Sequence, residues 1–134
     1  MSGPVVTDIA PGQLSADRGQ FWNASDVPAA LGISPYTTRQ ELLNRLKYGV
    51  CKPVTSHTEK IWAEGHEIEA LARPIAERLI GDLLPPKRVT LGKLGATLDG
   101  YTVNDSTCEP INWECKSLND AIRAAFPLQR GRGF

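Results

Sequence analysis

Two short segments in the last third of the sequence carry residues whose types and spacing could do chemistry. Segment 95–101 contains Asp99, and segment 111–117 contains Glu114 and Lys116. Side chains alternate between the two faces of a strand, so Glu114 and Lys116 would project from the same face. If the two segments pair as strands, two carboxylates and one ammonium group share a patch of sheet.

Such a patch has the chemistry of a divalent-cation site. Two carboxylates repel each other unless a cation lies between them, and hard oxygen ligands suit Mg²⁺. Lys116 could orient a water molecule or offset charge on a transferring phosphoryl group. A solvated hairpin is the simpler interpretation of an isolated Glu-x-Lys, but Ile111, Trp113 and Cys115 give this one apolar neighbours. The sequence therefore predicts a Mg²⁺ site built on a strand pair.

The composition is that of a single globular domain. The chain has 134 residues, is 41% hydrophobic, and carries fifteen basic and fifteen acidic residues, so its formal charge is zero. A neutral chain argues against a protein that coats nucleic acid through bulk charge, although a local basic channel remains compatible. Three cysteines without a C-x-x-C pair indicate neither a disulfide framework nor a structural zinc site. Without a long apolar run or a signal pattern, we expect a cytoplasmic protein that does not enter a membrane.

Capping residues, glycines and hydrophobic spacing predict the elements that must position the patch. Helices are expected over 25–31, 38–49, 58–81 and 119–125, and strands over 88–91, 96–103 and 111–117. Pro74 should kink or divide the longest helix. Residues 1–17 are expected to form an irregular arm before a single domain over 18–134. N-terminal helices followed by a small mixed sheet and a last helix predict an α/β or α+β fold.

The longest predicted helix adds a third acidic residue. Its apolar stripe comprises Ile61, Ile68, Ala72, Ile75 and Leu79. Glu69 lies one step off this stripe, where it could face the sheet and supply another acidic ligand; an exposed glutamate is the alternative. Gly65, one turn earlier, costs about 1 kcal/mol relative to alanine and suggests that another group approaches the backbone there. His57 and His66 form no metal-binding pair and are expected at the surface or at helix ends.

Segment 24–49 has a second interpretation, from another functional class. A short helix followed by a capped helix is typical of a helix-turn-helix, which would make the chain a DNA-binding regulator without catalysis. Pro28 and Pro35 fit such a unit poorly, and a regulator would leave the acidic patch unused. The basic residues available for DNA are Arg39, Arg45 and Lys47.

The order of five short motifs resembles the phage recombination exonucleases, the lambda exonuclease and YqaJ-type viral recombinases among the restriction-endonuclease-like PD-(D/E)XK nucleases. The motifs are Arg18, Ser25-Asp26, Gly65-His66-Glu67-Ile68-Glu69, Thr97-Leu98-Asp99-Gly100 and Glu114-Cys115-Lys116. The resemblance covers residues 18–116 and implies a restriction-endonuclease-like core. A site-specific endonuclease of the same fold shares the metal patch and is a further alternative.

The resemblance also implies roles for individual residues. Asp99 and Glu114 match the family's metal-binding carboxylates, and the main-chain carbonyl of Cys115 would be a further ligand of Mg²⁺, for which Mn²⁺ can substitute. Glu69 matches the helix glutamate that supports the metal site. Lys116 matches the catalytic lysine beside the attacking water.

A second group of residues matches the positions that hold the 5′-phosphate of a DNA end. These residues are Arg18, Ser25 and Thr97. The implied activity is Mg²⁺-dependent 5′-to-3′ digestion of double-stranded DNA ends, which leaves a 3′ strand for a single-strand annealing protein. Members of the lambda type are ring-shaped trimers, so a homo-oligomer is expected.

The sequence departs from the family pattern in two places. Leu98 precedes Asp99, where the family often has proline. The family also continues into a long helix with glutamine and aromatic residues beside the site, whereas this sequence ends at Phe134. We therefore expect a core that lacks its last helix, an apolar face without its usual cover, and weakened activity.

Overall fold

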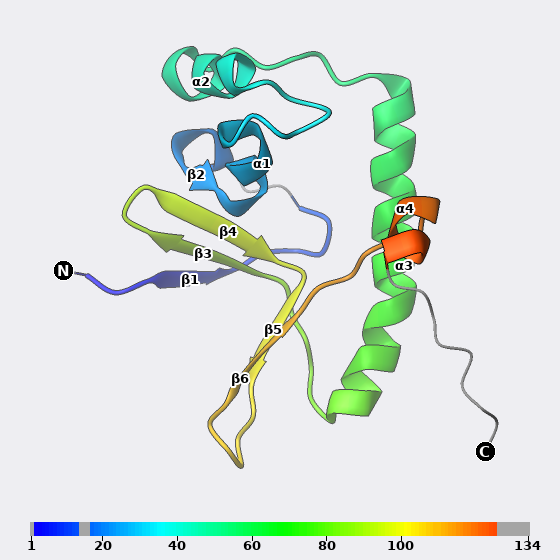
Figure 1. Cartoon of the computed structure of the whole chain (residues 1–134). Coiled ribbons are helices and arrows are strands. Elements are labelled where there is room, and N and C mark those ends of the chain that lie inside the picture. The colour runs from blue at the N-terminus through cyan, green and yellow to red at the C-terminus, as the bar shows by residue number, and fades with distance from the viewer. Residues whose placement is uncertain (1, 14–16, 126–134) are drawn as a thin grey trace.

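The chain folds into a mixed sheet, a separate hairpin and a long helix that runs beside both (Figure 1). The computed structural model describes residues 2–13 and 17–125. Its strands are β1 (Val5–Asp8), β2 (Trp22–Asn23), β3 (Lys87–Leu91), β4 (Leu94–Leu98), β5 (Gly100–Val103) and β6 (Pro110–Trp113). Its helices are α1 (Val27–Ala30), α2 (Arg39–Tyr48), α3 (Ser56–Ile80) and α4 (Asp120–Ala125), with 3-10 turns η1 (Arg18–Gln20) and η2 (Ala24–Asp26). This is an α+β fold.

The four-stranded sheet has the order β1-β3-β4-β2. β3 pairs antiparallel with both β1 and β4, whereas β2 runs parallel to β4. The sheet is therefore mixed, as the sequence predicts. β5 and β6 form an antiparallel hairpin of their own. The hairpin points away from the sheet in Figure 1.

The chain turns between β4 and β5, so the prediction of one continuous strand over 96–103 is wrong. Gly100, the first residue after the break, packs closely against its neighbours. A Cβ atom at this position would lie 2.9 Å from the Cβ of Leu84 and 3.0 Å from the Trp113 ring, so a larger residue would displace its neighbours. Asp99 is consequently left at the junction between the sheet and the hairpin.

The prediction of an irregular arm over residues 1–17 is also wrong, because β1 is the edge strand of the sheet. Three consecutive β-branched residues, Val5, Val6 and Thr7, give this segment a high strand propensity. Asp8 at its end forms an ion pair with Lys87 of β3. Gly3, Pro4, Pro11 and Gly12 flank this strand and predicted an irregular segment, whereas pairing with β3 stabilises the short strand between them.

The capping signals of α2 and α3 are largely confirmed. Thr38 and Glu41 form the predicted capping box, in which the Thr38 hydroxyl accepts from the Glu41 N–H at 3.2 Å and Glu41 accepts from the Thr38 N–H at 2.8 Å. Helix α3 starts at Ser56, two residues before the predicted Thr58, because Thr55 provides the N-cap. Pro74 does not divide α3, which is one helix of 25 residues.

Helix α3 turns a different face to the sheet than its apolar pattern predicts. Glu69, Arg73 and Glu77 are part-buried, and Arg73 and Glu77 bond the backbone of Leu84 on the strand side. Four residues of the apolar stripe are instead exposed: Ile61, Ile68, Ile75 and Leu79. The polar residues face inward because the connection 81–86 presents backbone donors and acceptors to the helix. No helix within 2–13 and 17–125 is long and apolar enough to span a bilayer.

The most buried polar residue of the described sheet is Arg88 on β3, which is 2% exposed. Its Nη2 donates to the side-chain Oδ1 of Asn23 at 2.8 Å, and its Nη1 donates to the Thr97 hydroxyl at 3.4 Å. The guanidinium also lies over the Phe21 ring, 5.6 Å from its centroid, and pairs with Asp17 at 3.6 Å. One buried cation therefore joins the N-terminal segment to strands β3 and β4.

Gly95 on β4 leaves the space that this cation occupies. A Cβ atom at Gly95 would lie 2.5 Å from Arg88 Nη2. We predict that Gly95→Ala lowers the free energy of unfolding by about 1–3 kcal/mol, since it crowds a packed core. Gly19→Ala is the matched control, because no atom lies within 4 Å of its added Cβ. Urea denaturation of both variants measures the difference, and equal stability would show that Arg88 does not depend on Gly95.

Candidate metal and phosphate site

Asp99 and the end of β6 meet as the sequence predicts. The hairpin register pairs Gly100 with Trp113, so Asp99, just before β5, and Glu114, just after β6, are the next residues opposite each other. The Cys115 N–H donates to Asp99 Oδ2 at 2.8 Å. This bond fixes the carboxylate of Asp99 against the backbone of the segment that carries Glu114 and Lys116.

Glu114 and Lys116 lie on the same side of the chain. Lys116 Nζ is 2.5 Å from Glu114 Oε1, and both side chains are exposed. The hydrogen bond from Lys116 to Glu114 raises the pKa of the lysine above its ordinary value, although partial burial opposes the shift. Lys116 therefore keeps its positive charge at neutral pH, which suits a group that stabilises negative charge and not a general base.

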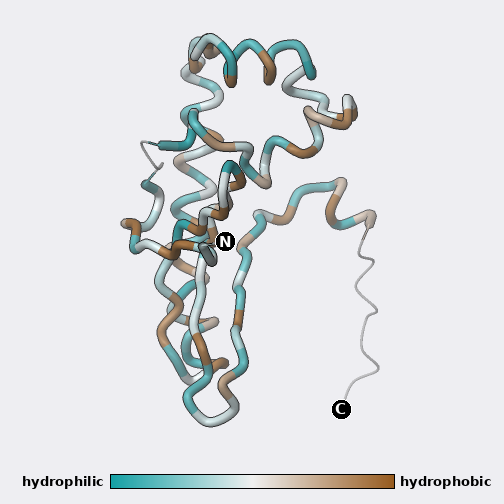
Figure 2. The backbone as a smooth tube through the Cα atoms, turned by 90° about the vertical axis from the view of Figure 1, so that its left-hand side faces the viewer, coloured by the Kyte–Doolittle hydropathy of each residue, from teal (hydrophilic) through white to brown (hydrophobic). Residues whose placement is uncertain are grey.

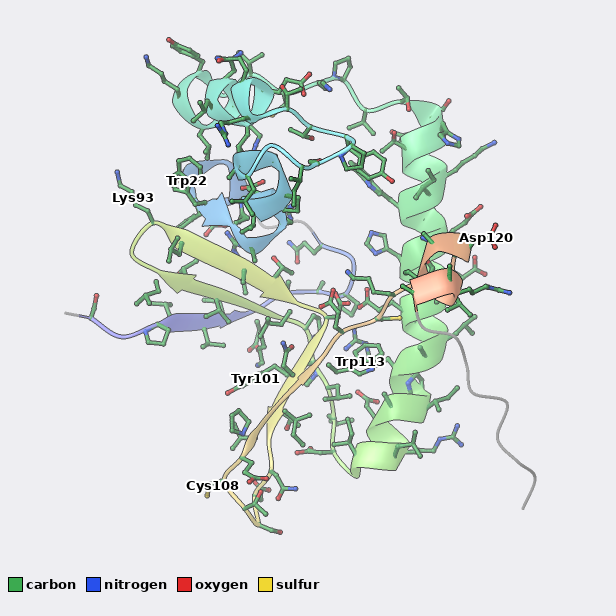
Figure 3. All side chains as sticks on the ribbon, viewed as in Figure 1. Trp22, Lys93, Tyr101, Cys108, Trp113 and Asp120 are labelled. Carbon is green, nitrogen blue, oxygen red and sulfur yellow. The ribbon has the colours of Figure 1, made fainter. Side chains whose placement is uncertain are left out.

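Glu69 comes to this junction from α3. It forms an i,i+4 ion pair with Arg73, and both side chains are mostly buried. Arg73 also donates to the Leu84 carbonyl and lies 5.1 Å from the centroid of the Trp113 ring. Figure 3 places Trp113 between the hairpin and α3. Arg73 thus holds the helix against the hairpin and fixes Glu69, which is not the exposed glutamate of the alternative interpretation.

The thiol of Cys115 lies within the field of all these charged groups. Burial raises the pKa of Cys115 above its ordinary value, and the carboxylates of Asp99, Glu69 and Glu114 raise the pKa further, whereas Lys116 lowers it. Three parts of the chain therefore bring charged groups to the surroundings of Cys115: α3 brings Glu69, the junction of β4 and β5 brings Asp99, and the segment after β6 brings Glu114 and Lys116. We call Glu69, Asp99, Glu114 and Lys116 the carboxylate cluster.

The carboxylates are satisfied by protein groups in this arrangement. Glu69 pairs with Arg73, Glu114 pairs with Lys116, and Asp99 accepts the Cys115 N–H. Within the part of the chain that the structure describes, no three histidine, cysteine, aspartate or glutamate side chains already stand at metal-binding geometry. The donors are the hard oxygens that Mg²⁺ prefers, and cation binding would require Glu69 and Glu114 to exchange partners.

A small pocket of about 100 Å³ adjoins the cluster. Its polar lining includes His66, Glu69, Thr97 and Asp99, and the N-terminal loop closes it with Gly12 and Gln13. The His66 ring lies against Gly12, whose added Cβ would be 3.3 Å from Nδ1. His66 was not predicted to line the site, although its i−3 position relative to Glu69 places both residues on one helix face.

Arg18 and Ser25, the predicted phosphate-binding pair, are in contact. Arg18 Nη2 donates to Ser25 Oγ at 2.6 Å. Asn23 lies between them in the chain and donates to the Arg18 carbonyl at 2.9 Å while it accepts from Arg88. Thr97 accepts from the same Arg88 and also lines the pocket beside Asp99. Arg88 therefore connects the phosphate-binding pair to Thr97 through hydrogen bonds.

Segment 24–49 does not form the predicted alternative, a helix-turn-helix. Helix α1 has four residues, and residues 31–38 separate it from α2, whereas that motif joins two full helices by three or four residues. Two of its basic residues face protein groups. Arg45 pairs with Asp26 at 2.7 Å, and Arg39 donates to the Ala30 carbonyl at 2.8 Å. Ser25 is not the predicted N-cap, because it lies within η2, which Asn23 caps, and α1 follows with Asp26 as its N-cap.

The raised pKa of Cys115 offers a measurement of the cluster. In a chain whose other cysteines are serine, the alkylation rate by iodoacetamide should reach half its maximum at a pH above the ordinary thiol pKa. Glu69→Gln should move this midpoint to lower pH, because it removes a negative charge that disfavours the thiolate. Glu67→Gln, an exposed change on the same helix, should leave the midpoint in place. An equal response to both changes would place Glu69 away from Cys115.

No protein-family model, curated protein or solved structure matches this chain. The resemblance to the phage recombination exonucleases therefore remains a proposal. Its structural support consists of two features, the carboxylate cluster and the contact between Arg18 and Ser25.

Proposed function

We propose that this chain is a metal-dependent deoxyribonuclease that digests double-stranded DNA from its 5′ ends. The carrying observation is that Asp99 accepts from the Cys115 N–H at 2.8 Å and lines one pocket with Glu69, while Glu114 and Lys116 form an ion pair on either side of Cys115. Carboxylates grouped beside a lysine at the edge of a pocket are the residue types that a divalent cation and a phosphoryl group require. The mixed sheet with α3 beside it supports the further proposal of a restriction-endonuclease-like core.

The proposed cofactor is Mg²⁺, with Mn²⁺ as a substitute. Asp99, Glu114, Glu69 and the main-chain carbonyl of Cys115 would hold it. Bound there, the cation would act as a Lewis acid on the scissile phosphate and lower the pKa of a coordinated water. Asp99 has the best-fixed position of these ligands, because it accepts a hydrogen bond from the Cys115 N–H of the segment that also carries Glu114.

The chain's own cations have separate tasks in this proposal. Lys116 stays protonated and neutralises charge that develops on the phosphoryl oxygens. Arg18 can bind a terminal phosphate through two parallel hydrogen bonds, and the Ser25 hydroxyl, already in contact with it, can add a third. Thr97 lies between this pair and Asp99 in the network of Arg88, so its hydroxyl can contact the same DNA end.

The proposed product also indicates the partners. Digestion from the 5′ end leaves a 3′ single strand, which a single-strand annealing protein would take up. An endonuclease with the same cluster differs only in the surroundings that receive the DNA. The contact between Arg18 and Ser25 favours an enzyme that recognises a terminal phosphate.

Glu114→Gln should reduce metal-dependent cleavage of linear duplex DNA at least a hundredfold, because it removes a proposed ligand and the partner of Lys116. Circular dichroism should show an unchanged fold, since Glu114 is exposed. Glu109→Gln, an exposed change on the same hairpin, is the control and should retain activity. Cleavage that survives Glu114→Gln would contradict the site assignment.

A further inference from the structure

Helix α3 presents an apolar stripe that no described part of the chain covers. Ile61, Ile68 and Ile75 recur at seven-residue intervals, and Leu71 and Leu79 extend the stripe. All five are exposed, Leu71 to 69%. Helix α4 does not cover them: the two helices overlap in Figure 1, but Figure 2 shows α4 standing apart from the rest of the molecule. The stripe lies beside the face that carries Glu69 and Arg73.

The total exposed surface of the chain is larger than that of a compact monomer of the same mass, as expected for a chain with a surface of association. The whole chain exposes 10663 Å², whereas a compact monomer of 14.6 kDa exposes about 6,900 Å². An interface of ordinary size buries about 1,600 Å² in total, less than half of this difference. Large contiguous apolar patches on a monomer mark surfaces of association.

The charges along the stripe fit a second copy of the same helix. Glu64 and Arg78 lie on the same edge as Leu71, each seven residues from it, on opposite sides. If two α3 helices pair antiparallel about a two-fold axis at Leu71, Glu64 of each copy faces Arg78 of the other. Neither residue has an ion pair in ranges 2–13 and 17–125. The pattern is therefore self-complementary in charge as well as apolar.

The opposite edge of the stripe permits a close approach. It carries Gly65 and Ala72, whose small side chains let two helix backbones come near each other. No atom of the chain lies within 4 Å of a Cβ added at Gly65, so the expected approach of another group to this glycine does not come from the described fold. A partner helix would supply it.

We infer that the chain forms a two-fold dimer through an antiparallel pair of α3 helices centred on Leu71. The seven-residue spacing of Ile61, Ile68 and Ile75 matches the seam of paired helices. Glu69 and Arg73 remain on the neighbouring face toward the hairpin, so each copy keeps its carboxylate cluster. This inference does not depend on the proposed nuclease activity.

Sedimentation velocity of the full chain over a range of concentrations tests the dimer. The chain should sediment as a dimer, and Leu71→Glu should convert it to a monomer, because the new carboxylates of the two copies then face each other at the two-fold axis. Ala63→Glu adds the same charge to another face of α3 and should leave the dimer intact. Leu71 is exposed, so circular dichroism should show that the variant keeps its helix content.

Charge reversal tests the register and direction of the pairing. Glu64→Arg and Arg78→Glu should each weaken the dimer about tenfold, since each replaces two attractive pairs by repulsive ones. The double variant should regain the original dissociation constant, because the pairs are restored with their signs exchanged. A monomeric or trimeric wild-type chain, a dimer that survives Leu71→Glu, or a double variant no tighter than the single ones would overturn the inference.

Discussion

The fold depends on how one buried cation is satisfied. Arg88 lies inside the molecule, and a buried charge without partners destabilises a fold by several kcal/mol. Its partners come from two distant parts of the sequence: Asn23 and Asp17 from the N-terminal segment, and Thr97 from β4. The short parallel pairing of β2 with β4 brings Asn23 to the guanidinium. The cation therefore sets where the segment with Arg18 and Ser25 lies on the sheet.

A second arginine, Arg73, fixes the position of the carboxylate cluster. Arg73 joins α3 to the Leu84 carbonyl and to the face of Trp113, and it holds Glu69 by an ion pair. The two arginines thus position the two parts of the proposed site: Arg88 positions the predicted phosphate-binding pair, and Arg73 positions the carboxylate cluster. Thr97 belongs to both, because it accepts from Arg88 and lines the pocket with Glu69 and Asp99.

Much of the site was accessible from sequence because its geometry is local. Side-chain alternation in a strand over 111–117 predicted that Glu114 lies beside Lys116; the two side chains do pair, although β6 ends at Trp113 and the predicted strand was too long. The turn residues between two strand patterns predicted the hairpin that brings Asp99 to Cys115. The capping box of Thr38 and Glu41 is likewise a short-range signal. Each of these features is decided by residues within a few positions of one another or by a simple antiparallel register.

The features that the sequence did not predict depend on distant contacts. Strand β1 exists because it pairs with β3, which is distant in the sequence: Val6, for example, lies opposite Val89. The apolar stripe of α3 predicted burial, but it could not tell burial in the chain's own core from burial against another molecule. His66 lines the pocket because the loop at Gly12 passes over α3 and lies against the His66 ring, with Gly12 in the left-handed backbone region. Pattern alone carries no information about such neighbours.

We propose that the chain digests linear duplex DNA from a phosphorylated 5′ end with a divalent cation. The most direct measurement compares linear DNA with a 5′-phosphate, the same DNA with a 5′-hydroxyl, and a covalently closed circle, each titrated with Mg²⁺. We expect cation-dependent loss of the linear DNA, faster when it carries a 5′-phosphate, whereas the covalently closed circle should stay intact. Nicking of the circle would identify an endonuclease, and binding without any cleavage would contradict the assignment of the carboxylate cluster.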